Sequence, residues 1–230
     1  MYQKNIFIFV ILLFTTNILA QTKIDSTNTD KNTPKTVKWY FYTGIGGVSY
    51  MGDLENSYAR WGGMFHIGVQ TYHKRRINPR FEAFYGTISG QNSLYTFANE
   101  NPNKFFQTHL FGINANIQLT ILQKKTYSIY LSQGLGMAGF TVYDKNGADL
   151  ATQAKTRALG EVIPSTTLFL PTNIGGMVFF QNQFGLGIEI GLLNTMTDYL
   201  DNIAKFGTNT GNDNVMRMKF SFYAPIYRKK

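Results

Sequence analysis

Residues 184–192 read Phe-Gly-Leu-Gly-Ile-Glu-Ile-Gly-Leu, so large apolar side chains alternate with glycine and one glutamate. An alternation with a period of two predicts a β-strand, because successive side chains of a strand point to opposite faces. A strand of a soluble sandwich would bury the apolar row and leave an almost bare glycine face in water. A strand in the wall of a small membrane barrel explains both rows, since the apolar row meets hydrocarbon and the other row fits a narrow interior.

The first twenty residues have the parts of a secretory signal peptide. Lys4 precedes the apolar run 6–14, and a polar break separates this run from Ile18-Leu19-Ala20. We expect cleavage after Ala20, with a retained N-terminal anchor as the alternative. The chain has no cysteine, which excludes a lipoprotein anchor, disulfides and thiolate sites. The rest of the sequence has no apolar run of about eighteen residues, so a mature membrane protein must be a barrel.

Composition and alternation divide the rest of the chain into three parts. Residues 21–36 carry almost no apolar side chain and are expected to be a flexible periplasmic leader, and residues 228–230 are a basic tail. Between them, residues 37–227 are predicted to form eight strands, at 37–50, 60–73, 79–90, 105–122, 126–143, 165–181, 184–199 and 214–227. The expected fold is all-β, an eight-stranded antiparallel up-and-down transmembrane barrel of the outer-membrane type. A soluble, lipocalin-like barrel is the alternative.

The predicted connections alternate in length. Those after the second, fourth and sixth strands are short, and those after the other strands are long, the longest running from residue 144 to residue 164. Outer-membrane barrels have short periplasmic turns and long external loops, so we assign the short connections to the periplasm. Because eight strands enclose an interior just wide enough for side chains, a diffusion channel is not expected.

The inward rows of the predicted strands contain charged residues. Glu82, Glu189, Arg217 and Lys219 all fall in these rows. A lone charge in a barrel interior is costly, so such residues are tolerable only when they pair. We therefore expect these four residues to form a buried charge network that fills the lumen.

Basic residues gather at the predicted periplasmic end. The leader, the early first strand, the turns and the tail hold 12 of the 21 Lys and Arg residues beyond Lys4, against only Asp25 and Asp30. Five of the basic residues lie in the short turns: Lys74, Arg75, Arg76, Lys124 and Lys125. Contact with lipid phosphates, or solubility, is one interpretation. The sharper hypothesis is a docking surface for an acidic periplasmic partner.

Three carboxylates are expected to approach one another at the external end. Asp53 follows the first strand, and Asp198 and Asp201 end the seventh. In an eight-stranded closure, only the last strand separates these two strand ends. We expect the three side chains to cap turn amides. Binding of a hard cation such as calcium is the alternative.

Signals for catalysis are weak. Of the three histidines, His73 falls at a short turn, His109 lies in a lipid-facing row, and His66 faces the interior with no assignable serine and acid. The glycines of residues 134–139 have the spacing of a dinucleotide loop, but a strand follows where a helix is required. We expect no enzyme, no cofactor, no small-molecule substrate and no nucleic-acid partner.

Three parts of the chain resemble a known family. They are Val48-Ser-Tyr-Met-Gly-Asp-Leu54, then Ile77-Asn-Pro-Arg-Phe81 with Tyr85-Gly-Thr-Ile-Ser-Gly90, and Gly187-Ile-Glu-Ile-Gly191 with Thr197-Asp-Tyr-Leu-Asp201. On these segments the chain resembles the family of Bacteroidetes outer-membrane β-barrels that includes PorG of the type IX secretion machinery. The loop 144–164 and the tail Tyr227-Arg-Lys-Lys230 depart from the pattern.

The resemblance implies an anchoring and assembly role in protein secretion that is linked to gliding motility. It implies outer-membrane lipid around the barrel and a periplasmic ring of partner proteins, one of them a lipoprotein. The basic turns predicted above would face that ring. Two alternatives remain: a stand-alone structural or adhesive barrel that acts through its external loops, and a lipid-modifying enzyme centred on His66.

Overall fold

The computed structural model describes residues 37–71, 76–96, 100, 102–208 and 211–227. The chain divides into two compact units, Met1–Lys35 and Thr36–Lys230, and the second contains all of these residues. Several sequence predictions fall outside the described residues: the signal peptide, the leader 21–36, the tail 228–230, His73, Lys74 and Arg75.

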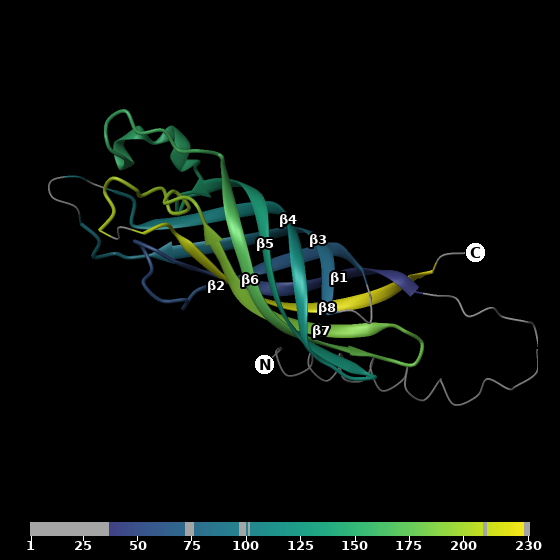
Figure 1. Cartoon of the computed structure of the whole chain (residues 1–230). Coiled ribbons are helices and arrows are strands. Elements are labelled where there is room, and N and C mark those ends of the chain that lie inside the picture. The colour runs from purple at the N-terminus through teal and green to yellow at the C-terminus, as the bar shows by residue number, and fades with distance from the viewer. Residues whose placement is uncertain (1–36, 72–75, 97–99, 101, 209–210, 228–230) are drawn as a thin grey trace, which may run out of the picture. The chain divides into compact units, whose positions relative to one another are not determined.

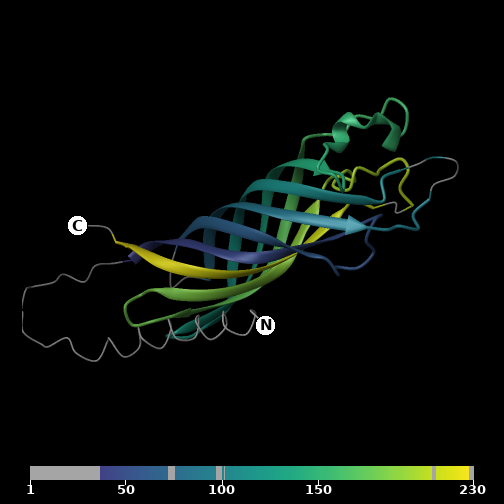
Figure 2. The same cartoon turned by 180° about the vertical axis from the view of Figure 1, so that it is seen from behind.

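Eight antiparallel strands pair in chain order, and the last pairs with the first to close a barrel (Figures 1 and 2). The strands are β1 (Val37–Met51), β2 (Trp61–Thr71), β3 (Ile77–Gln91), β4 (Phe105–Gln123), β5 (Tyr127–Tyr143), β6 (Thr166–Phe179), β7 (Gly185–Thr195) and β8 (Asn214–Tyr227). The predicted all-β, eight-stranded up-and-down fold is confirmed. None of the helical segments within the described ranges is long and apolar enough to cross a membrane.

The connections have the predicted alternation of lengths. The short connections β2–β3, β4–β5 and β6–β7 lie at one end of the barrel, which we call the turn end. The first residues of β1 and the last residues of β8 pair at the same end. The four long connections lie at the other end, the loop end (Figure 1). The longest of them, between β5 and β6, contains the 3-10 segments η2 (Leu150–Thr152) and η3 (Ala154–Thr156).

The largest error in the predicted strand bounds is at the end of the seventh strand, and the sixth strand, predicted at 165–181, is also shorter in the structure. The alternation suggested a seventh strand reaching residue 199, but β7 ends at Thr195. The Met196 amide still donates to Leu168 of β6, at 2.9 Å, whereas the carbonyl of Thr197 accepts the amide of Asp213 at 3.0 Å. Residues 198–201 therefore belong to a folded loop and not to the sheet.

Burial follows the pleat of the strands. On β4 the exposed outward row is Phe111, Ile113, Ala115, Ile117, Leu119 and Ile121, and the buried inward row includes Gly112, Asn114, Asn116, Gln118 and Thr120. The molecule is thus apolar outside and polar inside over much of its wall. This arrangement suits a wall surrounded by hydrocarbon and not one surrounded by water.

The interior has three layers. Along β8 the inward row passes from Tyr223 near the turn end through Ser221, Lys219 and Arg217 to Val215 near the loop end. The first layer consists of five aromatic residues and one methionine: Tyr40, Tyr42, Tyr130, Phe179, Tyr223 and Met177. The second is charged, and the third is an apolar core to which the loops contribute Leu150, Leu200, Ile203 and Phe206.

Inward glycines make room for aromatic rings on neighbouring strands. A Cβ atom on Gly68 would lie 2.4 Å from the Tyr42 ring, and one on Gly136 would lie 2.3 Å from the Phe169 ring. The same holds for Gly187, whose Cβ would lie 2.8 Å from the ring of Tyr223. In the row of residues 185–191, Gly185 and Gly187 are therefore needed for ring packing as well as for a narrow lumen.

Candidate functional site

Five charged side chains meet in the middle of the barrel, and we call them the lumen network. Four of them are the residues predicted from the sequence, Glu82, Glu189, Arg217 and Lys219; the fifth is Arg80. None is more than 3% exposed. The inward face of β3 supplies Arg80 and Glu82, β7 supplies Glu189, and β8 supplies Arg217 and Lys219.

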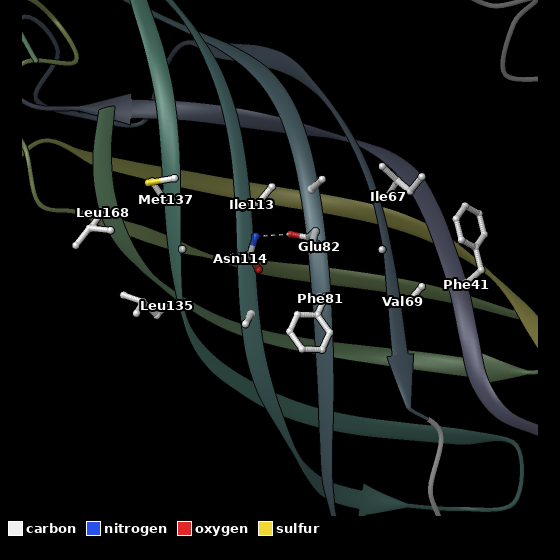
Figure 3. A pocket seen from close by; sticks show the side chains of 14 residues that line it. Phe41, Ile67, Val69, Phe81, Glu82, Ile113, Asn114, Leu135, Met137 and Leu168 are labelled. Carbon is white, nitrogen blue, oxygen red and sulfur yellow. Dashed lines mark hydrogen bonds between the residues drawn. The ribbon is translucent and has the colours of Figure 1, made fainter. Parts of the chain in front are cut away.

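Glu82 lies at the centre of the network. Its Oε1 is 2.8 Å from Arg217 Nη1, and its Oε2 is 2.6 Å from Lys219 Nζ and 3.3 Å from Arg80 Nη2. Asn114 also donates to Oε1 at 3.4 Å, as Figure 3 shows. Both carboxylate oxygens therefore have cationic partners, which removes the cost of an unpaired buried charge.

Glu189 is the second carboxylate of the network. Lys219 Nζ lies 2.5 Å from its Oε1, while Arg80 Nη1 and the Tyr130 hydroxyl, at 2.9 Å, bind its Oε2. The Arg80 guanidinium also lies over the Tyr42 ring, 4.9 Å from its centroid, in a cation–π contact. Sequence reasoning missed Arg80, although it lies two residues before Glu82 in the same alternating row.

His66 has a serine partner that spacing did not reveal. Its Nε2 lies 2.9 Å from Ser221 Oγ, and the contact passes over Gly44 of β1, which pairs with both residues. The pair is buried, with exposures of 0% and 6%. Within the described residues, His66 Nδ1 has no hydrogen-bond partner. A base and a hydroxyl therefore meet here without an orienting acid and without access for a substrate.

His109 lies on the outer wall, as the alternation predicted. Its Nδ1 is 2.6 Å from the Tyr85 hydroxyl, and its ring meets that of Tyr143 edge to face, with centroids 5.3 Å apart. All three residues lie in the loop-end halves of their strands. They form a polar and aromatic group where the apolar wall ends.

The described part of the basic turns is exposed at the turn end. Arg76, Lys124 and Lys125 are all exposed. The Arg76 carbonyl accepts the amide of Thr120 at 2.7 Å, so the turn before β3 lies against the last residues of β4. The structure thus places three of the five predicted docking residues on one end of the barrel.

Two of the three predicted rim carboxylates accept hydrogen bonds from backbone amides. Asp53 Oδ1 accepts the amide of Thr208 at 2.8 Å, and Asp201 Oδ1 accepts the amide of Ile203 at 2.8 Å. The Asp201 contact is an Asx turn, whereas the Asp53 contact joins two different loops. Over the described ranges, no group of three His, Cys, Asp or Glu residues could hold a metal ion. Backbone amides thus engage Asp53 and Asp201, and the cation hypothesis for Asp53, Asp198 and Asp201 stays a prediction.

A further carboxylate, Asp213, joins Asp201 at the loop end. Tyr50 Oη lies 2.7 Å from Asp201 Oδ2 and 2.7 Å from Asp213 Oδ1. Burial raises the pKa of Asp201 to about 8, and burial and the charge of Asp201 raise that of Asp213 well above its usual value. No periodic signal links these three residues, since more than a hundred positions separate Tyr50 from the two carboxyls.

The described parts of the β7–β8 connection, residues 196–208 and 211–213, cover the barrel mouth, and we call them the cap loop. Asn202, with a φ of 73°, donates to Asn103 Oδ1 at 2.8 Å and to Thr156 Oγ1 at 2.9 Å. Arg157 Nη1 donates to Asn202 Oδ1 and to the Leu150 carbonyl, both at 3.1 Å. The cap loop is thus hydrogen-bonded to the β3–β4 and β5–β6 connections.

A shallow apolar hollow of about 700 Å³ lies on the outer wall (Figure 3). It lies between two cross-strand rows of outward side chains, one containing Phe81 and the other Ile113. The surface is recessed on β3 and β4 because Ala83 and Ala115 are smaller than the side chains around them. The outward side chains that line it are Phe41, Ile67, Val69, Phe81, Ala83, Ile113, Ala115, Leu135, Met137 and Leu168.

No protein-family model and no curated protein matches the chain by sequence. Among solved structures, Neisserial surface protein A matches with a TM-score of 0.51 at 14% identity, over 82% of this chain and 97% of that one. The chain has the fold of an eight-stranded outer-membrane β-barrel. Ail of Yersinia pestis (TM-score 0.47, 9% identity, 81% and 97% covered) and the N-terminal barrel domain of Pseudomonas aeruginosa OprF (0.41, 10%, 82% and 98%) also match. At such identities the likeness concerns the fold alone, so the Bacteroidetes family stays a resemblance.

Proposed function

We propose that this chain is a non-enzymatic outer-membrane barrel that anchors an assembly of periplasmic proteins. The observation that carries the proposal is the contrast between its two ends. The loop end is covered by a folded cap loop, whereas the turn end exposes Arg76, Lys124 and Lys125. Among the described residues, the turn end thus offers positive charge with no acidic side chain beside it.

The interior argues against transport and catalysis. Paired charges occupy the middle layer, and aromatic and apolar side chains fill the layers on either side. The inward-facing pair of a base and a hydroxyl, His66 with Ser221, is buried among them. A lumen filled in this way leaves no route for a solute and no room for a substrate beside the histidine.

The outer wall supports a place in the outer membrane. Large apolar residues occupy the outward rows of the strands, and Trp39, Tyr127 and Tyr227 lie near the turn end, where an aromatic belt is expected. The apolar hollow around Ala83 and Ala115 suits an acyl chain of the surrounding lipid. In this proposal the segment 1–20 directs export and is cleaved after Ala20.

The partner that we propose is an acidic protein of the periplasm. Clustered cations attract such a surface over a Debye length and orient it before contact. Lys74 and Arg75 belong to the same turn as Arg76 in the sequence and add to its charge. By the resemblance given above, the partner would be a ring protein or lipoprotein of the type IX secretion machinery.

The test is affinity capture from gently solubilised outer membranes of the native host, with mass spectrometry of the recovered proteins. One variant changes Arg76, Lys124 and Lys125 to Glu; its matched control changes three exposed loop-end lysines, Lys145, Lys155 and Lys205, to Glu. We expect the wild type and the control to recover the same periplasmic proteins and the turn-end variant to lose them. Equal recovery by all three contradicts docking at the basic turns.

A second candidate is a stand-alone adhesive barrel, and the loop tips favour it. Leu94, Leu159 and Val162 are between 81% and 103% exposed, which is unusual for apolar residues outside the wall. Their replacement by Ser should weaken attachment of cells to a surface if the tips are adhesive. Capture of the barrel alone, together with that loss of attachment, would replace the first proposal with this one.

A further inference from the structure

One phenol at the loop end lies between two buried carboxyl groups. Tyr50 Oη is 2.7 Å from an oxygen of Asp201 and 2.7 Å from an oxygen of Asp213. A phenol carries a single hydrogen, so it can donate to only one of them. The other contact requires a hydrogen on the carboxyl side, because two bare oxygens at that distance would repel each other. The geometry therefore demands at least one protonated carboxyl.

The remaining oxygens of the two carboxyls are already used. Asp201 Oδ1 accepts the amide of Ile203, and Asp213 Oδ2 accepts the amide of Leu200, both at 2.8 Å. The three side chains are at most 1% exposed. Water is thus not at hand to solvate a second negative charge, which favours retention of the hydrogen.

The charged surroundings favour the proton as well. Asp53 of the β1–β2 connection and Asp198 of the cap loop both act on Asp201 as negative charges, and Asp198 also acts on Asp213. The phenol of Tyr95, from the β3–β4 connection, donates to the Phe206 carbonyl at 2.6 Å. The guanidinium of Arg157, from the β5–β6 connection, donates hydrogen bonds to neutral acceptors, which are the Leu150 and Ala151 carbonyls and the Asn202 amide oxygen.

We propose that the cap loop is a proton-locked closure of the barrel mouth. A proton held among Asp201, Tyr50 and Asp213 keeps the loop folded against the apolar core, and loss of that proton releases it. The loop is well placed for such control, because it buries Leu200 and Ile203 in the core. The backbone amides of these two residues donate hydrogen bonds to the carboxyl groups of Asp213 and Asp201. This closure is independent of the partner that binds the turn end.

The direction of the pH effect follows from proton binding. In the released loop the carboxyls return to water and to their ordinary pKa of 3.8, whereas in the closed loop burial raises the pKa of Asp201 to about 8. The closed state therefore binds more protons between these limits. For one retained proton, release becomes up to about tenfold more favourable for each pH unit across that window. The cap loop is expected to be closed in acid and to open as pH rises.

The test uses Asp201→Asn in the full-length barrel, refolded into phosphatidylcholine vesicles. The amide Nδ2 can donate to Tyr50 Oη while the amide oxygen keeps the Ile203 contact, so this contact no longer needs a proton bound by Asp201. The readout is cleavage by a lysine-specific protease at Lys205, which is exposed between the buried residues Ile203 and Phe206. Dividing the wild-type rate by the Asp201→Asn rate at each pH cancels the pH dependence of the protease.

We expect this ratio to be near one at pH 6 and to rise at least tenfold by pH 9. A ratio that stays flat overturns the proposal. It is also overturned if folded Asp201→Asn is cleaved faster than the wild type at pH 6, because the carboxylate itself would then be the structural requirement. Should Asp201→Asn fail to fold, judged by the gel shift of the unboiled protein, Asp213→Asn serves in the same comparison.

Discussion

The lumen network and the cap loop both bury carboxyl groups in the same barrel, yet they neutralise them differently. The network lies on strands, where the register fixes each residue opposite a chosen partner, as with Glu189 and Lys219. The cap carboxyls, Asp201 and Asp213, lie in a connection and face each other across one phenol. Strands can thus hold opposite charges at fixed spacing, whereas the loop depends on a proton. The middle of the barrel is therefore closed at every pH, whereas closure of the mouth depends on the bound proton in our proposal.

The largest expected effect is that of Glu82→Ala. It leaves Arg80, Arg217 and Lys219 with a single carboxylate, and removal of one partner from a buried ion pair costs about 3–5 kcal/mol. Urea unfolding in vesicles, followed by the gel shift, measures the loss. Gln118→Ala, at a buried amide outside the network, is the control and should cost far less. Similar losses for the two variants would mean that charge is not what holds this layer.

Gly136→Ala probes the apolar layer between the two regions. The added methyl would lie 2.3 Å from Phe169, and forced overpacking of a core costs about 1–3 kcal/mol. Gly63→Ala adds the same group on the outer wall, where nothing lies within 4 Å, so its effect should be near zero. The same unfolding assay compares them. A loss in the second variant that matches the first would show that strand propensity, and not packing against Phe169, accounts for the effect at Gly136.

Asn202→Ala should loosen the cap loop without unfolding the barrel. It removes the hydrogen bonds to Asn103 and Thr156 and puts alanine, which tolerates a φ of 73° less well than asparagine does, at this position, at a local cost of about 1–3 kcal/mol. We expect faster cleavage at Lys205 and an unchanged unfolding midpoint. Asn202→Gly keeps the backbone relaxed and loses only the side chain, so the difference between the two variants isolates the strain. A lowered urea midpoint for unfolding of the barrel would show that the stability of the cap loop is not independent of that of the barrel wall.

Asp198→Asn is expected to have the smallest effect. Burial and the charge of Asp53 raise the pKa of Asp198 to about 7, so its contribution to a closed cap is complete below pH 4 and is lost as pH rises through 7. An asparagine does not titrate and should slow cleavage at Lys205 at pH 8, but not at pH 5. Because the residue is half-exposed, solvent screening limits the gain to under about 1 kcal/mol. Slower cleavage at both pH values would assign the effect to something other than charge.

The middle of the barrel was predictable because alternation fixes the face of every strand residue. Glu82, Glu189, Arg217 and Lys219 needed only their strand assignments to be placed inside, and Arg80 would have followed from the same rule. Leu110, which broke the polar row of β4, belongs to the apolar layer, where inward residues change character near the mouth. The period of two thus identifies the inward residues, and their order along each strand then predicts the layers of the interior.

The mouth was not predictable, for a physical reason. The contacts of Tyr50 with Asp201 and Asp213 join loop and strand ends across 151 and 163 positions, and irregular connections have no period that could align them. His66 and Ser221 meet only because Gly44, on the strand between them, has no side chain. That meeting required the register of three strands, which alternation alone leaves undetermined. The extension of the seventh strand to residue 199 failed for the same reason.

The closing strand has a consequence for the order of assembly. Glu82 and Glu189 have only Arg80 as a cationic partner until β8 joins β7 and β1, bringing Arg217 and Lys219 into the lumen. An open sheet of seven strands therefore carries one excess negative charge at its centre, and the finished barrel carries one excess positive charge. The arrival of the last strand reverses the sign of the interior, so an unfinished barrel differs electrically, as well as in shape, from a finished one.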